Sequence, residues 1–189
     1  MVDAVLEVSK GFYPYLVENE SFIKEVIKKE EISFFNTLLD GISLLDKERK
    51  LYLSGDFLLP RISPNISDNF FDPLDDRLGE YLKYLNEIQE IGSQTSVFPC
   101  HDWPFNEGAQ RAKDLIKHHN HRLSLIIEAL NKKKITIMDS ISIIFDRKIG
   151  DEQMHFAIGE ARAHLIHLDV TGQAKSEMDE RGTVHYMKN

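Results

Sequence analysis

The sequence predicts an α/β (α+β) fold, in which a small sheet with flanking helices precedes a C-terminal domain of helices and a two-stranded hairpin. Short apolar runs end in Gly55-Asp56 and in Pro99-Cys100-His101, and they have the length and composition of strands. Apolar residues at helical spacing fill several longer stretches in the second half of the chain. Two short extended runs near the C-terminal end are typical of a hairpin.

Residues 1–41 form the first predicted segment, which is helical. Apolar residues from Phe22 to Ile27 fall at helical spacing and predict a helix from Asn19. A second short helix is expected over 34–39, before Gly41 interrupts the pattern. The first residues are acidic and their apolar run is too short for a signal peptide, and no stretch reaches the roughly twenty apolar residues that cross a bilayer.

Residues 42–125 are predicted to be the second domain. Two strands joined by a charged turn lead into a long loop rich in Pro, Asn, Ser and Asp, and a loop of this length in a compact domain is more often functional than idle. A further strand then stands between two amphipathic helices. The expected strands are 42–45, 50–54 and 95–98, the loop is 55–73, and the helices are 78–91 and 106–130.

Residues 126–189 are predicted to be a winged-helix-like domain. Helices over 135–145 and 151–169 precede a hairpin, and together with the end of helix 106–130 they give the order of a winged helix. A helix that reads duplex DNA usually carries several Arg and Lys residues, but 151–169 has only Arg162. We therefore do not expect the domain to bind duplex DNA.

Composition narrows the class of protein. A hydrophobic content of 42% in 189 residues supports a packed core in one domain or two small ones, and the net charge of −8 argues against nonspecific nucleic-acid binding by the whole molecule. Cys100 is the single cysteine, so the chain has no intramolecular disulfide and fits a reducing, cytoplasmic setting. We interpret Cys100 as a buried side chain rather than as a nucleophile activated by His101.

Asp56 and His101 are the candidate metal ligands. Each follows an apolar run, so a carboxylate and an imidazole are placed at the ends of two predicted strands. Both are common zinc ligands, yet a catalytic zinc needs three protein ligands. The two residues therefore predict part of a metal site. Taken alone, Asp56 would be interpreted as the cap of a turn.

Two motifs carry a resemblance to a known family. The stretch from Gly55 to Ser67 reads GDFLLPRISPNIS, and residues 99–102 read PCHD. They resemble two features of metallo-β-lactamase-fold hydrolases of the β-lactamase-like protein 2 type, which have a winged-helix-like C-terminal domain. The first is a strand that ends in Gly-Asp and is followed by Leu-Pro and a Ser-Pro-Asn-Ile-Ser-like loop, and the second is a strand that ends in Pro-Gly-His-Gly. The resemblance runs from about Ile42 to the C-terminus and implies a partial metallo-β-lactamase-type sheet.

That resemblance implies that Asp56 bridges two metal ions, zinc or another divalent metal, and that His101 is the last histidine ligand. A metal-bound hydroxide would attack an ester, thioester, lactone or phosphodiester. The family's His-x-His-x-Asp-His motif is absent, since the first histidine is His101 and the one His-x-His, at 119–121, lies in a helical stretch. No residue can be assigned as catalytic.

We therefore interpret the chain as a truncated metal-dependent hydrolase that is inactive alone. The isolated chain is expected to hold no metal, and a homodimer or a complementing chain would have to complete the site. The alternatives are a non-enzymatic binding or scaffold protein, the partner subunit of a split hydrolase, and a nucleic-acid module that its charge disfavours. The N-terminal helices, a second copy or a separate chain would cover the exposed edge and apolar face of half a sheet.

Arg61 and five histidines have open interpretations. Arg61 either holds a substrate anion or forms a surface salt bridge. His118, His119 and His121 could contribute to a metal cluster, but we favour an exposed polar helix face. His164 and His167 are expected to be partly buried near the hairpin.

Overall fold

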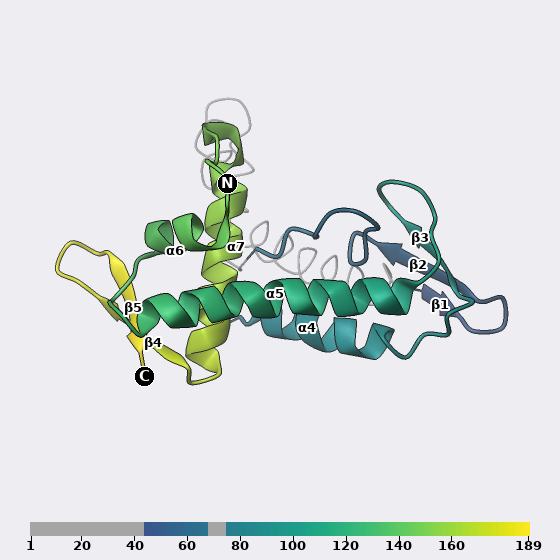
Figure 1. The fold of residues 1–189 in the computed structure, drawn as a ribbon, viewed down its shortest axis with the longest axis horizontal. Helices are drawn as coiled ribbons and strands as arrows, with labels where there is room; N and C mark the ends of the chain where they lie inside the picture. The colour runs from purple at the N-terminus through teal and green to yellow at the C-terminus, as the bar shows by residue number, and fades with distance from the viewer. Residues whose placement is uncertain (1–43, 68–74) are drawn as a thin grey trace, which may run out of the picture. The chain divides into compact units, whose positions relative to one another are not determined.

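The computed structural model describes residues 44–67 and 75–189 (Figure 1). The helices predicted between residues 19 and 39 lie outside these ranges. The chain divides into two compact units, residues 1–45 and 46–189. All described helices belong to the second unit, and the described residues also form two small sheets, so the predicted α+β class is confirmed. The predicted boundary between residues 125 and 126 stays a prediction.

The first sheet has the strand order β1-β2-β3. Its strands are β1 (Leu44–Asp46), β2 (Leu51–Gly55) and β3 (Ser96–Pro99). Strands β2 and β3 are parallel, with Leu53 opposite Phe98 and Gly55 opposite Pro99. Because the carboxyl ends of parallel strands meet at one edge, the residues that follow β2 and β3 are brought together.

Helices α4 (Arg77–Ile88) and α5 (Gly108–Leu130) run side by side (Figure 1). The Asp76 side chain caps α4 by accepting a hydrogen bond from the Gly79 amide. Helix α5 begins two residues later than predicted, because Glu107 has a left-handed backbone with a φ of 66°. A Cβ atom on Gly108 would lie 2.7 Å from the Val97 side chain, so glycine lets α5 start directly against β3.

The C-terminal part contains α6 (Ile137–Ile144), α7 (Asp151–Val170) and an antiparallel hairpin of β4 (Ala174–Met178) and β5 (Val184–Lys188). Thr136 and Asp139 form a reciprocal capping box at the start of α6. Gly172, with a φ of 72°, provides the left-handed residue that ends the turn after α7. The predicted helix–helix–hairpin order is therefore observed.

One hydrophobic core joins α5, α6, α7 and the hairpin. Helix α7 has buried residues on most of its circumference because α4, α5 and α6 all pack against it. Within the described residues, no helix combines the length and apolar character needed to cross a membrane. The most deeply buried members of this core are Leu78, Ile126, Ile135, Ala161, Leu165 and Leu168.

Candidate functional site

Asp56 and His101 meet at the carboxyl edge of the first sheet. The amide of Cys100 donates a hydrogen bond of 3.0 Å to the carbonyl of Gly55, which extends the β2–β3 pairing to the point where both side chains begin. The His101 Nε2 atom lies 3.4 Å from Asp56 Oδ1. Both side chains are about two-thirds exposed (65% for Asp56 and 68% for His101), so an incoming ligand can reach them.

The loop after Asp56 is held by backbone-directed hydrogen bonds. The buried Ser54 hydroxyl donates to the carbonyl of Leu58, and the Tyr81 hydroxyl donates to that of Phe57. Further along, the Arg111 guanidinium donates to two carbonyls, that of Leu59 at 2.7 Å and that of Ile62 at 2.9 Å. The first residues of α4 and α5 thus fix the loop that carries Asp56.

Arg111 and Tyr81 were not recognised from the sequence. The available signal was weak: Arg111 precedes Leu115 by four residues and therefore lies near the apolar face of α5. Tyr81 shows the same ambiguity, because a tyrosine on a buried helix face can be a core residue or a hydrogen-bond donor. Its burial raises the pKa of the Tyr81 hydroxyl, which therefore remains a donor at neutral pH.

Arg61 forms a two-pronged ion pair with Asp102. Its Nε atom donates to Asp102 Oδ2 at 3.1 Å, and its Nη2 atom donates to Oδ1. The hydrogen bond to Asp102 raises the pKa of Arg61, and the same bond lowers the pKa of the Asp102 carboxyl. This pair connects the loop to the segment after His101 and supports the salt-bridge interpretation of Arg61. Its predicted contact with a substrate anion stays a prediction.

The residues at this edge do not fit a complete metal site. Within 44–67 and 75–189, no cluster of three or more His, Cys, Asp or Glu side chains could hold a metal ion. Asp56 and His101 provide two donors, whereas a catalytic zinc needs three protein ligands. The metal-ligand roles predicted for Asp56 and His101 stay a prediction.

Cys100 is exposed, so its predicted burial is wrong. The residue follows the last position of β3, where the chain has already left the sheet, and the alternation of buried and exposed side chains no longer applies. Cys100 shows no geometry of an activated nucleophile, because no described base forms a hydrogen bond with it.

The prediction that His118, His119 and His121 form an exposed face of α5 is wrong for the middle residue, His119. His119 is fully buried and contacts His164, which is fully buried as well. The prediction of partial burial near the hairpin is therefore wrong for His164. His167 is partly buried and lies 3.0 Å from both carboxylate oxygens of Asp76, at the start of α4 rather than at the hairpin. Packing of α4, α5 and α7 causes these placements.

Curated proteins similar to parts of the chain are alanine–tRNA ligases. The ligase of Psychrobacter sp. (strain PRwf-1) is 37% identical over 114 residues, which are 60% of this chain and 12% of the ligase. That of Mycoplasma capricolum is 48% identical over 46 residues, 24% of this chain and 5% of the ligase. The chain spans only these small fractions of the ligases, so their activity does not carry over to it.

Two solved structures share the fold. A β-lactamase domain protein from Burkholderia ambifaria superimposes with a TM-score of 0.75 at 32% identity, and a metallo-β-lactamase family protein from Thermus thermophilus with a TM-score of 0.64 at 25% identity. Both cover 78% of this chain, which in turn spans 44% of each of them. Residues 123–189 match the family "Metallo-beta-lactamase-like, C-terminal domain". The chain therefore carries the C-terminal part of a metallo-β-lactamase-fold protein.

Proposed function

We propose that the chain contributes the C-terminal part of a metal-dependent hydrolase, in which Asp56 and His101 are two of the metal ligands. The observation that carries the proposal is the 3.4 Å approach of these exposed side chains at the carboxyl edge of β2 and β3. Zinc or another divalent metal is the cofactor that suits a carboxylate and an imidazole. The bond cleaved would be an ester, thioester or phosphodiester.

The remaining ligands would come from a complementing chain or from a second copy. Two observations support this step. The chain spans 44% of its solved relatives, so more than half of such a protein has no counterpart here. In addition, Leu53 and Phe98 are paired neighbours on β2 and β3, and their side chains are 47% and 38% exposed. Neighbouring exposed apolar side chains on a sheet are suited to contact with a partner.

A non-enzymatic scaffold is the second candidate. It is favoured by the shortage of ligands at the Asp56–His101 edge, since two exposed donors hold a metal weakly. In this case the winged-helix-like C-terminal domain that we propose for residues 126–189 would serve as an interface. The second helix of this domain, α7, carries Arg162 as its single Arg or Lys residue, which argues against duplex DNA as the partner.

The test is metal binding by the purified chain and by three variants. Zinc content would be measured by mass spectrometry, and zinc affinity by competition with a chelator, for Asp56→Ala, His101→Ala and the matched control His185→Ala. His185 is a suitable control because its Nε2 atom lies 3.0 Å from Asp179 in the hairpin, a similar Asp–His pair outside the site. We expect weak binding that both site variants abolish and the control retains.

The second arm asks whether the site can be completed. A separately produced metallo-β-lactamase N-terminal half that carries His-x-His-x-Asp-His would be mixed with the chain, and zinc affinity and esterase activity would be measured. Tighter zinc binding that requires both Asp56 and His101 supports the hydrolase. Zinc binding that is unaffected by both site variants, with or without the added half, would overturn the proposed site and favour the scaffold.

A further inference from the structure

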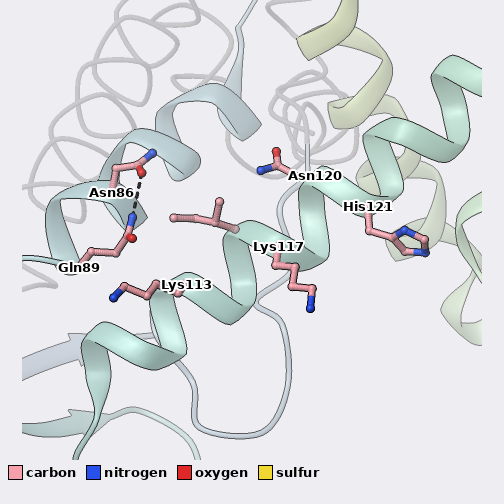
Figure 2. A pocket seen from close by; sticks show the side chains of 7 residues that line it. Asn86, Gln89, Lys113, Lys117, Asn120 and His121 are labelled. Carbon is pink, nitrogen blue, oxygen red and sulfur yellow. Dashed lines mark hydrogen bonds between the residues drawn. The ribbon is translucent and has the colours of Figure 1, made fainter.

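Helices α4 and α5 form an open groove of about 540 Å³ on the surface of the second unit, referred to here as the α4–α5 groove. Its size falls in the range of small-molecule sites, which is about 300–1,000 Å³. Figure 2 shows side chains from both helices around it, and none belongs to the Asp56–His101 edge. The lining consists of Asn86, Gln89, Lys113, Ile116, Lys117, Asn120 and His121.

The charge of the α4–α5 groove differs from that of the whole chain. The chain carries a net charge of −8, whereas the groove is lined by two lysines and a histidine and by no carboxylate. Lys113, Lys117 and His121 are spaced four residues apart on α5, which places them along one side of the helix. Neither lysine has an ion-pair or hydrogen-bond partner within 44–67 and 75–189. The two ammonium groups are therefore available to a ligand with negative charge.

The uncharged lining residues complement these cations. Asn86 and Gln89 on α4 hydrogen-bond to each other at 2.9 Å, as the dashed line in Figure 2 shows. Each amide keeps a further donor or acceptor, and Asn120 adds another amide from α5. Ile116 provides an apolar surface among these polar groups. An amide can hydrogen-bond the edge of a polar ring, and an aliphatic side chain can contact its face.

We propose that the α4–α5 groove binds a nucleotide-like ligand, with its phosphate groups at Lys113 and Lys117 and its ring among the amides and Ile116. Lysine binds phosphate as a point charge, which suits two flexible ammonium groups at an open surface. The volume of the groove accommodates a ligand of this size. This proposal does not depend on the proposed hydrolase, because no lining residue belongs to its site.

The experiment is calorimetric titration of the full chain with ADP at low salt, with inorganic pyrophosphate and adenosine as separate probes. We expect ADP to bind more tightly than either probe, and its affinity to fall with added salt. The double variant Lys113→Gln/Lys117→Gln should lower ADP affinity at least tenfold. The control Lys132→Gln/Lys148→Gln changes two lysines that are exposed but lie outside the groove and should retain wild-type affinity.

A second readout locates the ligand. In ¹⁵N-labelled protein, the side-chain amide signals of Asn86, Gln89 and Asn120 should shift on addition of ADP, and those of Asn189, in the C-terminal part of the chain, should not. No saturable binding of ADP at millimolar concentration would overturn the proposal. Equal losses in the groove and control variants would overturn it as well, since they would indicate nonspecific attraction. Equal affinity for pyrophosphate and ADP would overturn the assignment of the ring.

Discussion

The Nδ1 atom of His119 lies 3.2 Å from the Nε2 atom of His164, and both imidazole rings are fully buried. His164 Nδ1 is 2.7 Å from the carbonyl oxygen of Glu160, which can only accept a hydrogen bond. His164 must therefore donate from Nδ1 and accept at Nε2. It follows that His119 donates from Nδ1 to His164, and the unprotonated Nε2 atom of His119 lies 3.5 Å from the Ser63 hydroxyl. Two hydrogen bonds of fixed direction thus join His119 on α5 to the Glu160 carbonyl on α7.

The first prediction concerns the tautomers of these two rings. Both His119 and His164 should be neutral and protonated on Nδ1 at pH 7, because His164 Nδ1 faces a carbonyl oxygen and His119 Nδ1 faces the unprotonated Nε2 atom of His164. Long-range ¹H–¹⁵N correlation spectra distinguish the two tautomers through the ¹⁵N shifts of the ring. The exposed ring of His155 serves as the internal reference for the ¹⁵N shifts. A ring protonated on Nε2 at either buried position would contradict these two hydrogen bonds.

The second prediction is loss of stability in mild acid. Burial, the largest cause, lowers the pKa of His119 to about 2 and that of His164 to about 4, from 6.5. The unfolded chain therefore binds protons that the folded chain does not, so the free energy of unfolding falls as the pH drops from 6.5 towards 4. Each histidine that stays neutral contributes about 1.4 kcal/mol per pH unit in this window. Burial raises the pKa of Glu160, which opposes part of this loss.

Urea unfolding at pH 7.5, 6.5, 5.5 and 4.5 measures this slope. The lowered pKa values of Asp102, Asp139 and Asp179 start from 3.8, so these carboxyls titrate mainly below the window. The variant His119→Phe/His164→Leu should have a flatter pH dependence than the wild type, whatever its stability at pH 7.5. Equal slopes for the two proteins would show that the buried histidines do not cause the acid sensitivity.

The third prediction concerns the ion pair between Arg122 on α5 and Glu160 on α7. Both side chains are nearly buried, with 13% and 12% exposure, and the Arg122 guanidinium also lies 4.8 Å from the centre of the Phe145 ring. Arg122→Leu leaves the Glu160 carboxyl buried without its partner, and we expect a loss of about 3–5 kcal/mol in the free energy of unfolding. Arg122→Leu/Glu160→Leu should lose less than the single variant, because no buried charge remains.

Urea unfolding of the wild type, of Arg122→Leu, of Glu160→Leu and of the double variant completes a double-mutant cycle. The cycle gives the coupling free energy between the two side chains. Arg61→Leu is the matched control. Arg61 also forms an ion pair, with Asp102, but the Arg61 side chain is 74% exposed. We expect Arg61→Leu to lower the free energy of unfolding far less than Arg122→Leu, as for other exposed pairs. Additive losses at Arg122 and Glu160 would contradict a coupled buried pair.

The sequence predicted the parts of this protein that depend on local patterns. Apolar spacing located α4, α5, α6 and α7 to within a few residues, and apolar runs ending in polar residues located β2 and β3. The proximity of Asp56 and His101 could also be predicted, because two strand ends at one edge bring their following residues together. These inferences needed only periodicity and the geometry of a parallel sheet.

Burial of polar side chains could not be predicted in the same way. His119 stands between the polar residues His118 and Asn120, so composition favoured an exposed face, and only the packing of α7 against α5 shows that its ring is enclosed. The role of Arg111 could not be predicted for the same reason, since the carbonyls that accept its hydrogen bonds are more than forty residues away in the chain. Contacts between distant segments carry no local sequence signal.

The fourth prediction tests the contact between the loop and α7 at Gly159. In a helix interior, Gly→Ala usually stabilises by about 1 kcal/mol. A Cβ atom on Gly159 would lie 2.5 Å from the Oγ atom and 2.9 Å from the Cβ atom of Ser67, at the end of the loop that follows β2. The clash outweighs the gain in helix propensity, so we expect Gly159→Ala to lower the free energy of unfolding by about 1–3 kcal/mol.

Thermal and urea unfolding measure the effect, and a compensating variant identifies its cause. Ser67→Gly removes both clashing atoms, so Gly159→Ala/Ser67→Gly should recover most of the loss and reveal the favourable helix propensity of alanine. Gly150→Ala is the control, because a Cβ atom there meets nothing within 4 Å. If Gly159→Ala stabilises the protein by itself, the loop cannot lie against α7 as described, and the path that brings Ser63 to His119 would have to be redrawn as well.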